Sequence, residues 1–178
     1  MSAGELDLRD HIRDIPDFPK PGIVFRDITP LLLDPAAMDF AVRELAGWSR
    51  ERDVELVVAA EARGFILGAT IARELGVGFV PARKPGKLPH DTIRAEYMLE
   101  YGVDTLELHA DALAHGTRVL VHDDLIATGG TARAVCELVR QLGGEVAGCA
   151  FVIELAFLGG RNALAEYDVH SLVAYEAA

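Results

Sequence analysis

Several residue types are scarce in this sequence, and each scarcity excludes a class of protein. Its 178 residues include only two cysteines, Cys136 and Cys149, which are too few for a disulfide framework and lack a CxxC spacing. We therefore expect two buried free thiols in a reducing compartment. No apolar run approaches the ~18 residues of a membrane span, and the N-terminus lacks the basic start of a secretory signal. These absences predict a cytoplasmic protein with no membrane association.

Positive charge is scarce as well. Lysine and arginine total 17 against 28 aspartates and glutamates, which gives a formal net charge of -11 at pH 7. This sign opposes general attraction to nucleic acid or to an anionic membrane, so any bound anion needs a local cationic site. With 51% hydrophobic residues, the chain has ordinary globular composition and enough length to bury a core. We expect residues 1–178 to form a single domain.

The hydrophobic pattern predicts strands that alternate with helices. Short apolar runs rich in β-branched residues predict strands at 54–60, 77–83, 117–124, 145–155 and 170–176. Helical periodicity ending in glycine predicts helices at 64–76 and 129–144. Asp34 before Pro35 marks the start of another helix, which runs to about Arg52. Such alternation indicates an α/β fold, a mostly parallel twisted sheet with helices on both faces.

Two segments do not fit this alternation. Residues 1–33 combine a short helical pattern with a Pro- and Gly-rich stretch at 16–22, which predicts an N-terminal helix followed by an extended hood over the main fold. Residues 84–109 hold two alternating stretches punctuated by proline and glycine among polar residues. We predict that this insertion is a mobile antiparallel hairpin that serves as a lid.

The most informative segment is VLVHDDLIATGGTA at 119–132. Its apolar strand ends in Asp123 and Asp124, and a Gly-Gly loop then opens a helix, which is where open α/β sheets bind ligands. The glycines and the first helical amides suit a phosphate, and Thr128 and Thr131 add hydroxyl donors. Adjacent carboxylates are acceptors suited to the paired hydroxyls of a ribose. The segment therefore predicts a sugar-phosphate site.

Other common motifs are absent. The P-loop pattern GxxxxGK[ST] fails around Gly86 and Lys87, because Pro81 stands at the first glycine position and Leu88 follows the lysine. No GxGxxG motif follows the first strand. The six histidines show no metal-ligand spacing, and we expect His122 to be a core or edge residue rather than a base.

The segment at 119–132 resembles the phosphoribosyl pyrophosphate signature of the type I phosphoribosyltransferases. The resemblance, to the adenine phosphoribosyltransferase branch of that family, runs from about Ile12 to Glu176. It includes DFPKPGIVFRDITPLL at 17–32, EARGF at 61–65, and RKPGKLP with LEYG at 83–89 and 99–102. It implies purine salvage, in which adenine and 5-phosphoribosyl 1-pyrophosphate give AMP and pyrophosphate. It also implies a homodimer and Mg²⁺ held mainly by substrate oxygens and water, with no protein side chain as a metal ligand.

The same resemblance implies roles for particular residues. The pyrophosphate is expected to contact Arg63, Arg83, Lys84 and Lys87. The rest of the phosphoribosyl group is expected to contact Asp123, Asp124, Ala127, Thr128, Gly129, Gly130 and Thr131. Adenine is expected to contact Val24, Phe25, Arg26 and Leu155. The residues expected to act in catalysis are Lys87 and Glu100 on the lid, with Asp123 and Asp124 at the strand end.

Two alternatives stay open at this stage. A non-catalytic regulator with the same fold would sense a purine or a phosphoribosyl ligand. Such a protein is expected to carry a basic DNA-binding domain, for which this acidic chain has no spare length. The other alternative is a phosphoribosyltransferase for a different base, which only the resemblance of GIVFRD argues against.

Overall fold

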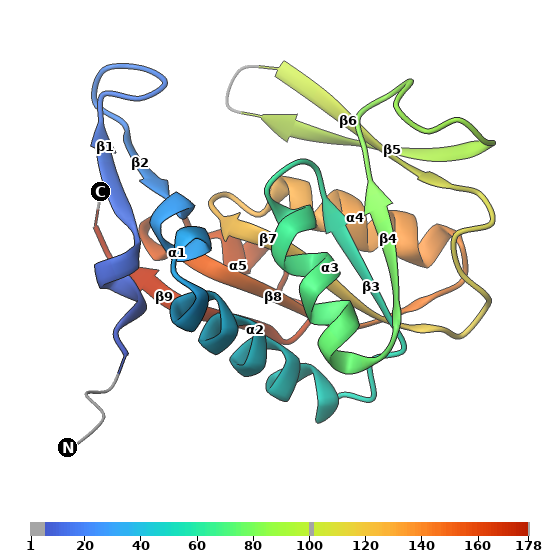
Figure 1. Cartoon of the computed structure of the whole chain (residues 1–178). Helices are drawn as coiled ribbons and strands as arrows, with labels where there is room; N and C mark the ends of the chain where they lie inside the picture. Colours follow the sequence, from blue (N-terminus) through green and yellow to red (C-terminus); the bar gives the residue numbers. More distant parts are fainter. Residues whose placement is uncertain (1–5, 100–101, 178) are drawn as a thin grey trace.

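A five-stranded parallel sheet forms the centre of the computed structural model, which describes residues 6–99 and 102–177 (Figure 1). In spatial order its strands are β4 (Gly78–Ala82), β3 (Leu56–Ala60), β7 (Arg118–Ile126), β8 (Glu145–Leu155) and β9 (Val169–Tyr175). All four neighbouring pairs are parallel. The predicted α/β class is confirmed, and no bound of these strands differs from its predicted position by more than two residues.

Helices cover both faces of this sheet. The helices α2 (Pro35–Arg50) and α3 (Gly64–Leu75) lie on one face, and α4 (Gly130–Gln141) lies on the other (Figure 1). Asp34 caps α2 as predicted, since its Oδ1 accepts hydrogen bonds from the N–H groups of Ala36 and Ala37 at 2.8 and 3.2 Å. Successive strand residues face opposite sides, so Val57 packs in the core under α2 and α3 while Val58 packs in the core under α4.

The N-terminal segment contains more regular structure than its sequence predicted. The expected helix is a single 3-10 turn at Leu8–His11. The expected extended hood is an antiparallel pair of β1 (Arg13–Pro16) and β2 (Val24–Asp27), followed by the short helix α1 (Thr29–Leu33). The Pro- and Gly-rich stretch forms the connection between the two strands, which hides their pairing from a pattern based on periodicity.

Residues 84–109 contain the predicted antiparallel hairpin. Its strands are β5 (Thr92–Leu99) and β6 (Gly102–His109). Ala95, Leu106 and Leu108 are buried against the core under α4, whereas Met98 near the tip is 72% exposed. The hairpin is therefore packed at its base, and the mobility expected of the lid stays a prediction.

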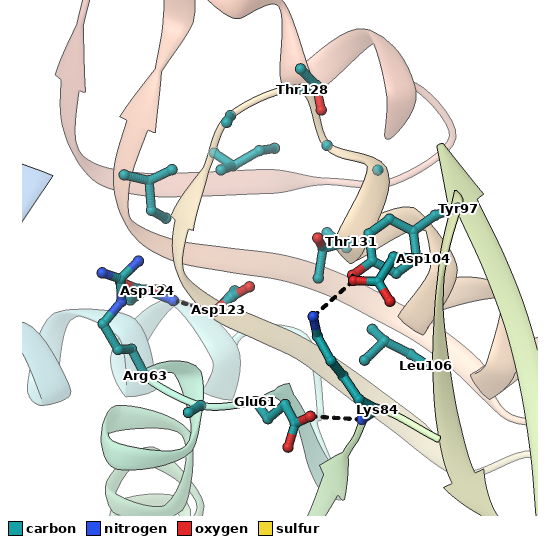
Figure 2. Close-up of a pocket in the computed structure, with 17 residues that line it drawn as sticks. Glu61, Arg63, Lys84, Tyr97, Asp104, Leu106, Asp123, Asp124, Thr128 and Thr131 are labelled. Atoms are coloured by element: carbon teal, nitrogen blue, oxygen red, sulfur yellow. Dashed lines mark hydrogen bonds and ion pairs between the residues drawn. The ribbon is translucent and has the colours of Figure 1, made fainter. Parts of the chain in front are cut away.

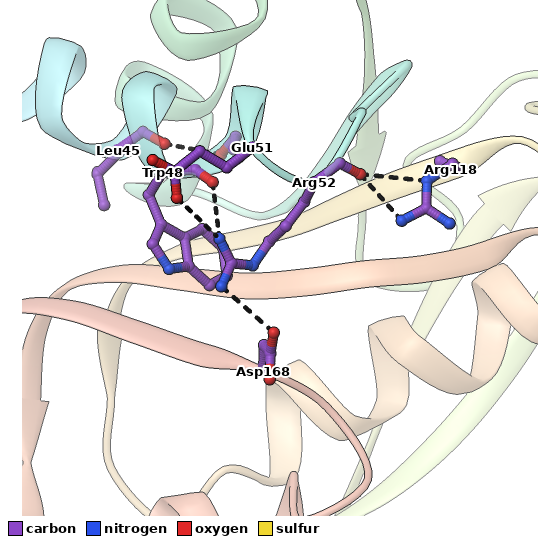
Figure 3. A network of polar contacts seen from close by, with 7 residues as sticks. Leu45, Trp48, Glu51, Arg52, Arg118 and Asp168 are labelled. Atoms are coloured by element: carbon purple, nitrogen blue, oxygen red, sulfur yellow. Dashed lines mark hydrogen bonds and ion pairs between the residues drawn. The ribbon is translucent and has the colours of Figure 1, made fainter.

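Two arginine side chains connect the C-terminal end of α2 to the end of the sheet where β7 and β9 begin. Figure 3 shows the Arg52 guanidinium over the Trp48 ring, and its Cζ lies 3.6 Å from the ring centroid. The guanidinium donates one hydrogen bond to the Trp48 carbonyl oxygen at 2.9 Å and one to Asp168 Oδ2 at 3.3 Å. Arg118, at the start of β7, donates from Nε and Nη2 to the Arg52 carbonyl oxygen at 3.1 and 3.0 Å. Asp124 lies toward the other end of β7, so this network supports the scaffold and not the predicted site.

The two cysteines are free, as the sequence predicted. Cys136 and Cys149 are buried free thiols whose Sγ atoms lie 3.6 Å apart. None of the helices within residues 6–99 and 102–177 has the length and apolar character needed to cross a membrane.

Two short turns that the sequence did not predict connect β8 to the last strand: a 3-10 turn at Ala156–Leu158 and α5 (Gly160–Ala163).

Candidate functional site

A pocket of about 660 Å³ opens at the carboxyl ends of β3, β4 and β7 (Figure 2). One wall is the 61–63 stretch after β3, and a second is the 123–132 stretch that leads from β7 into α4. The remaining wall comes from the β4–β5 loop and the hairpin, through Lys84, Tyr97, Asp104 and Leu106. Its volume and position are those expected of a small-molecule site in an open α/β sheet.

The loop before α4 is shaped for close approach of a ligand to the backbone. Gly129 has a φ of 83°, and an added Cβ would lie 2.5 Å from the Gly160 carbonyl oxygen, so only glycine fits there. The helix begins at Gly130, and its first amides have no partner within the helix, which makes its start suitable for an anion. The five predicted phosphate-loop residues all line the pocket: Ala127, Thr128, Gly129, Gly130 and Thr131.

Two carboxylates lie side by side at the end of β7. Asp123 Oδ1 accepts a hydrogen bond from the Asp124 N–H at 2.9 Å. Arg63 Nε lies 2.8 Å from Asp124 Oδ2, and the Asp124 side chain is only 6% exposed. The two groups form an ion pair, but the Arg63 N–H does not point at the oxygen well enough to make a hydrogen bond. Asp124 Oδ2 therefore accepts no hydrogen bond within the described residues. A buried acceptor is thus available to a ligand hydroxyl.

The environment of Asp123 also favours a ligand hydroxyl as its partner. Burial, and then the negative charge of Asp124, raises the pKa of Asp123 well above its usual value, while Arg63 offsets part of the effect. A hydroxyl donor or a cation beside this carboxylate would relieve the cost of its charge. The carboxylate pair is therefore suited to hydroxyl groups or to a divalent cation.

The lysine of the pocket is already paired with a carboxylate. Lys84 Nζ lies 2.9 Å from Asp104 Oδ2, which also accepts a hydrogen bond from the Tyr97 hydroxyl at 3.1 Å (Figure 2). The bond to Lys84 lowers the pKa of Asp104, and the bond to Asp104 raises the pKa of Lys84. Both groups are therefore charged at neutral pH.

Glu61 holds the start of the β4–β5 loop. Its Oε1 accepts a hydrogen bond from the Lys84 N–H at 2.8 Å, and its Oε2 accepts one from Arg83 Nε at 3.0 Å. Burial raises the pKa of Glu61, but the hydrogen bonds from Lys84 and Arg83 outweigh it and the net shift is downward. The carboxylate thus stays ionised and joins the loops after β3 and β4.

The structure brings only two of the four predicted pyrophosphate contacts into the pocket lining. Arg63 and Lys84 line the pocket, but Arg83 is engaged by Glu61 beside it. Lys87 is exposed in the loop before β5 and does not line this pocket. Glu100, the predicted catalytic residue of the lid, lies outside the described residues.

Three polar residues that line the pocket had no predicted role: Glu61, Tyr97 and Asp104. Tyr97 and Asp104 are opposite each other in the β5–β6 register, two residues beyond the buried pair Ala95 and Leu106. They therefore continue the inward face of the hairpin. A carboxylate at an inward position of an alternating strand is a sequence signal that would have identified Asp104.

Of the four predicted adenine contacts, Phe25 lies beside Arg63. The four are Val24, Phe25 and Arg26 on β2, and Leu155 at the end of β8. The Arg63 guanidinium lies 4.7 Å from the centroid of the half-buried Phe25 ring. Arg26 stacks on the Tyr175 ring at 4.0 Å, and Leu155 is the register partner of Tyr175 in the β8–β9 pair. Phe25 thus connects the candidate base site to the pocket at Arg63.

Comparisons with known proteins agree on one family. Residues 32–170 match the family model described as Phosphoribosyl transferase domain. The chain is 59% identical, over 168 residues, to the adenine phosphoribosyltransferase of Nitrosococcus oceani, a match that covers 94% of this chain and 98% of that protein.

Solved structures show the same similarity. The crystal structure of adenine phosphoribosyltransferase from Thermoanaerobacter pseudethanolicus is 52% identical, has a TM-score of 0.92, and is matched over 94% of this chain and 98% of that chain. The enzyme from Saccharomyces cerevisiae, in complex with D-2,5-dideoxy-2,5-imino-altritol 1,6-bisphosphate and adenine, is 39% identical with a TM-score of 0.86, over 93% of this chain and 96% of that one. Fold, pocket and sequence similarity together mean that the chain belongs to the adenine phosphoribosyltransferases, within the phosphoribosyl transferase domain family.

Proposed function

We propose that the pocket binds 5-phosphoribosyl 1-pyrophosphate and transfers its phosphoribosyl group to adenine, which yields AMP and pyrophosphate. The observation that carries this proposal is the presence of two binding chemistries in one pocket. Asp123 and Asp124 offer acceptors to two neighbouring ribose hydroxyls, and the loop at 127–131 offers backbone amides to a phosphate. A sugar phosphate satisfies both at once.

The other parts of the reaction follow from the neighbours of the carboxylates. Arg63 contacts both Asp124 and the Phe25 ring, so the ribose and the base would lie on its two sides. Adenine would stack on Phe25 and attack C1 of the ribose from the face opposite the leaving pyrophosphate. The two aspartates would stabilise the positive charge that develops at C1. Glu100 remains our candidate acceptor for the proton of the base.

Mg²⁺ belongs to this proposal because of the charge of the pocket. The lining holds four carboxylates, those of Glu61, Asp104, Asp123 and Asp124, against the two cations Arg63 and Lys84. A substrate with several negative charges would therefore enter a site that is formally negative, and a divalent cation offsets that repulsion. The available Asp124 oxygen and the raised pKa of Asp123 fit a nearby cation.

The protein would not hold this ion by itself. The described residues include no group of three or more His, Cys, Asp or Glu side chains placed to bind a metal. Substrate oxygens and water would supply most of the ligands, with Asp123 and Asp124 nearest to them. When bound, the ion would neutralise the pyrophosphate as it leaves.

Turnover of free bases tests the proposal. Purified protein is incubated with MgCl2, 5-phosphoribosyl 1-pyrophosphate and either adenine, hypoxanthine or guanine, and nucleotide is measured with and without EDTA. Adenine should be used far better, because a pocket that accepts hydrogen bonds from an amine leaves acceptors unpaired against a 6-oxo group. Equal use of hypoxanthine would refute the base assignment. Binding of the substrate without turnover of any base would favour a sensor.

The family resemblance also leads us to propose a cytoplasmic homodimer that acts on small molecules and binds no nucleic acid. Light scattering on the purified protein should give twice the mass of one chain. A monomer at assay concentration would contradict the proposed assembly without affecting the proposed chemistry.

A further inference from the structure

Asp104 lines the pocket without a role in the proposed reaction. Its carboxylate lies 2.9 Å from the ammonium of Lys84, the pocket lysine that we assign to pyrophosphate. The two side chains are 24% and 55% exposed, so the ion pair is open to solvent and to a ligand. Asp104 has the same sign of charge as pyrophosphate, and both would bind the same cation.

The position of this carboxylate is well determined. Oδ1 accepts a hydrogen bond from the Thr105 N–H at 2.9 Å, and Oδ2 accepts from Lys84 and from the Tyr97 hydroxyl. Asp104 is thus held on the inward face of the hairpin, pointing at the lysine (Figure 2).

Lys84 does not depend on Asp104 for its backbone position. Its N–H donates to Glu61 Oε1 at 2.8 Å, and Glu61 is itself held by Arg83. Only the end of the lysine side chain is engaged by Asp104. Removing the charge of Asp104 would therefore free the ammonium and leave the loop in place.

We propose that Asp104 is a positioning residue that occupies Lys84 before pyrophosphate binds, and so weakens the binding of pyrophosphate and favours its release. The inference rests on the proposed function, because that function assigns Lys84 to pyrophosphate. A pyrophosphate oxygen must take over a donor that Asp104 already holds, so each binding event loses an ion pair and each release restores it. For a partly exposed pair this competition corresponds to roughly a two- to fivefold change in affinity.

Asp104→Asn tests the inference, because asparagine keeps the size: its amide oxygen can still accept the Thr105 N–H, and its NH2 group can donate to the Tyr97 hydroxyl oxygen. Isothermal titration of sodium pyrophosphate in MgCl2 should give a Kd roughly two- to fivefold lower than for the wild type. KM for 5-phosphoribosyl 1-pyrophosphate should fall in parallel, without a rise in kcat. Structural damage weakens binding, so tighter binding is a result that a merely structural role cannot produce.

Asp91→Asn is the matched control. Asp91 is an exposed acid just before β5, outside the pocket lining, so its replacement makes the same change in net charge and should leave the Kd unchanged. In a Lys84→Met background, Asp104→Asn should no longer tighten binding. Asp104→Ser removes the same charge if the asparagine variant does not fold, and should shift the Kd in the same direction.

Equal or weaker pyrophosphate binding by the folded Asp104 variants would overturn the inference. So would an equal gain in affinity with Asp91→Asn, or a gain that persists without Lys84. A wild-type protein that neither binds pyrophosphate nor converts adenine would instead overturn the proposed function, so the two failures are distinguishable.

Discussion

Mild acid should destabilise this protein through one buried histidine. His122, on the central strand β7, is fully buried, and its Nδ1 lies 2.8 Å from the Ala150 carbonyl oxygen. A carbonyl oxygen only accepts, so Nδ1 carries the hydrogen, and the buried Nε2 has no partner within the described residues. Burial lowers the pKa of His122 from 6.5 to about 4, although the bond to Ala150 opposes the shift.

The size of the effect follows from these pKa values. The folded state takes up a proton less readily than the unfolded chain, so the contribution of His122 to stability is complete above pH 6.5 and is lost as the pH falls toward 4. The full difference corresponds to about 3 kcal/mol, of which about 2 kcal/mol is already lost at pH 5.

His122→Val removes the titrating group and keeps an apolar, β-branched side chain in the strand. The lost hydrogen bond costs about 1 kcal/mol at every pH, so it shifts the free energy of unfolding without changing its pH dependence. Urea unfolding at several values between pH 7.5 and 5 should show that the variant loses about 2 kcal/mol less than the wild type. His90→Val, at a histidine side chain that is 62% exposed, should retain the wild-type pH dependence. Equal losses in the wild type and His122→Val would refute the reasoning.

Three further changes test other parts of the structure. Asp123→Asn should reduce nucleotide formation yet raise the melting temperature at pH 7.5. Burial and then the neighbouring carboxylate raise the pKa of Asp123, so its contribution to stability is lost as the pH rises through that value; a lower melting temperature would contradict this. Gly129→Ala should lower the free energy of unfolding by about 1–3 kcal/mol, because of the positive φ and the Gly160 carbonyl oxygen 2.5 Å from the added Cβ; wild-type stability in urea would disprove the requirement for glycine. Arg161→Met removes two hydrogen bonds of 2.7 Å to the buried Glu154 and should cost about 1–2 kcal/mol at pH 7.5, allowing for the exposure of the arginine. Since the bond to Arg161 lowers the pKa of Glu154, that cost should shrink as the pH falls below 4.5, and a cost independent of pH would count against the charge pairing.

Local sequence determined the sheet, its helices and the phosphate loop. A strand covered on both faces needs a continuous apolar run, so β8 was predicted with the bounds 145–155 that it has. Asp34 before Pro35 predicted the start of α2, and Gly76 predicted the end of α3. The carboxylates and the glycine loop are contiguous in the chain, which makes their combined chemistry visible without a structure.

Only the tertiary structure decided which charges meet. The sequence presents Arg83, Lys84 and Lys87 as one positive cluster, yet the first pairs with Glu61, the second with Asp104, and the third is exposed in a loop. Periodicity is a property of neighbouring residues and survives in the sequence. Ion pairing and burial depend on distances between segments that are far apart along the chain. The partner of Lys84 and the raised pKa of Asp123 therefore exist only once the fold has formed.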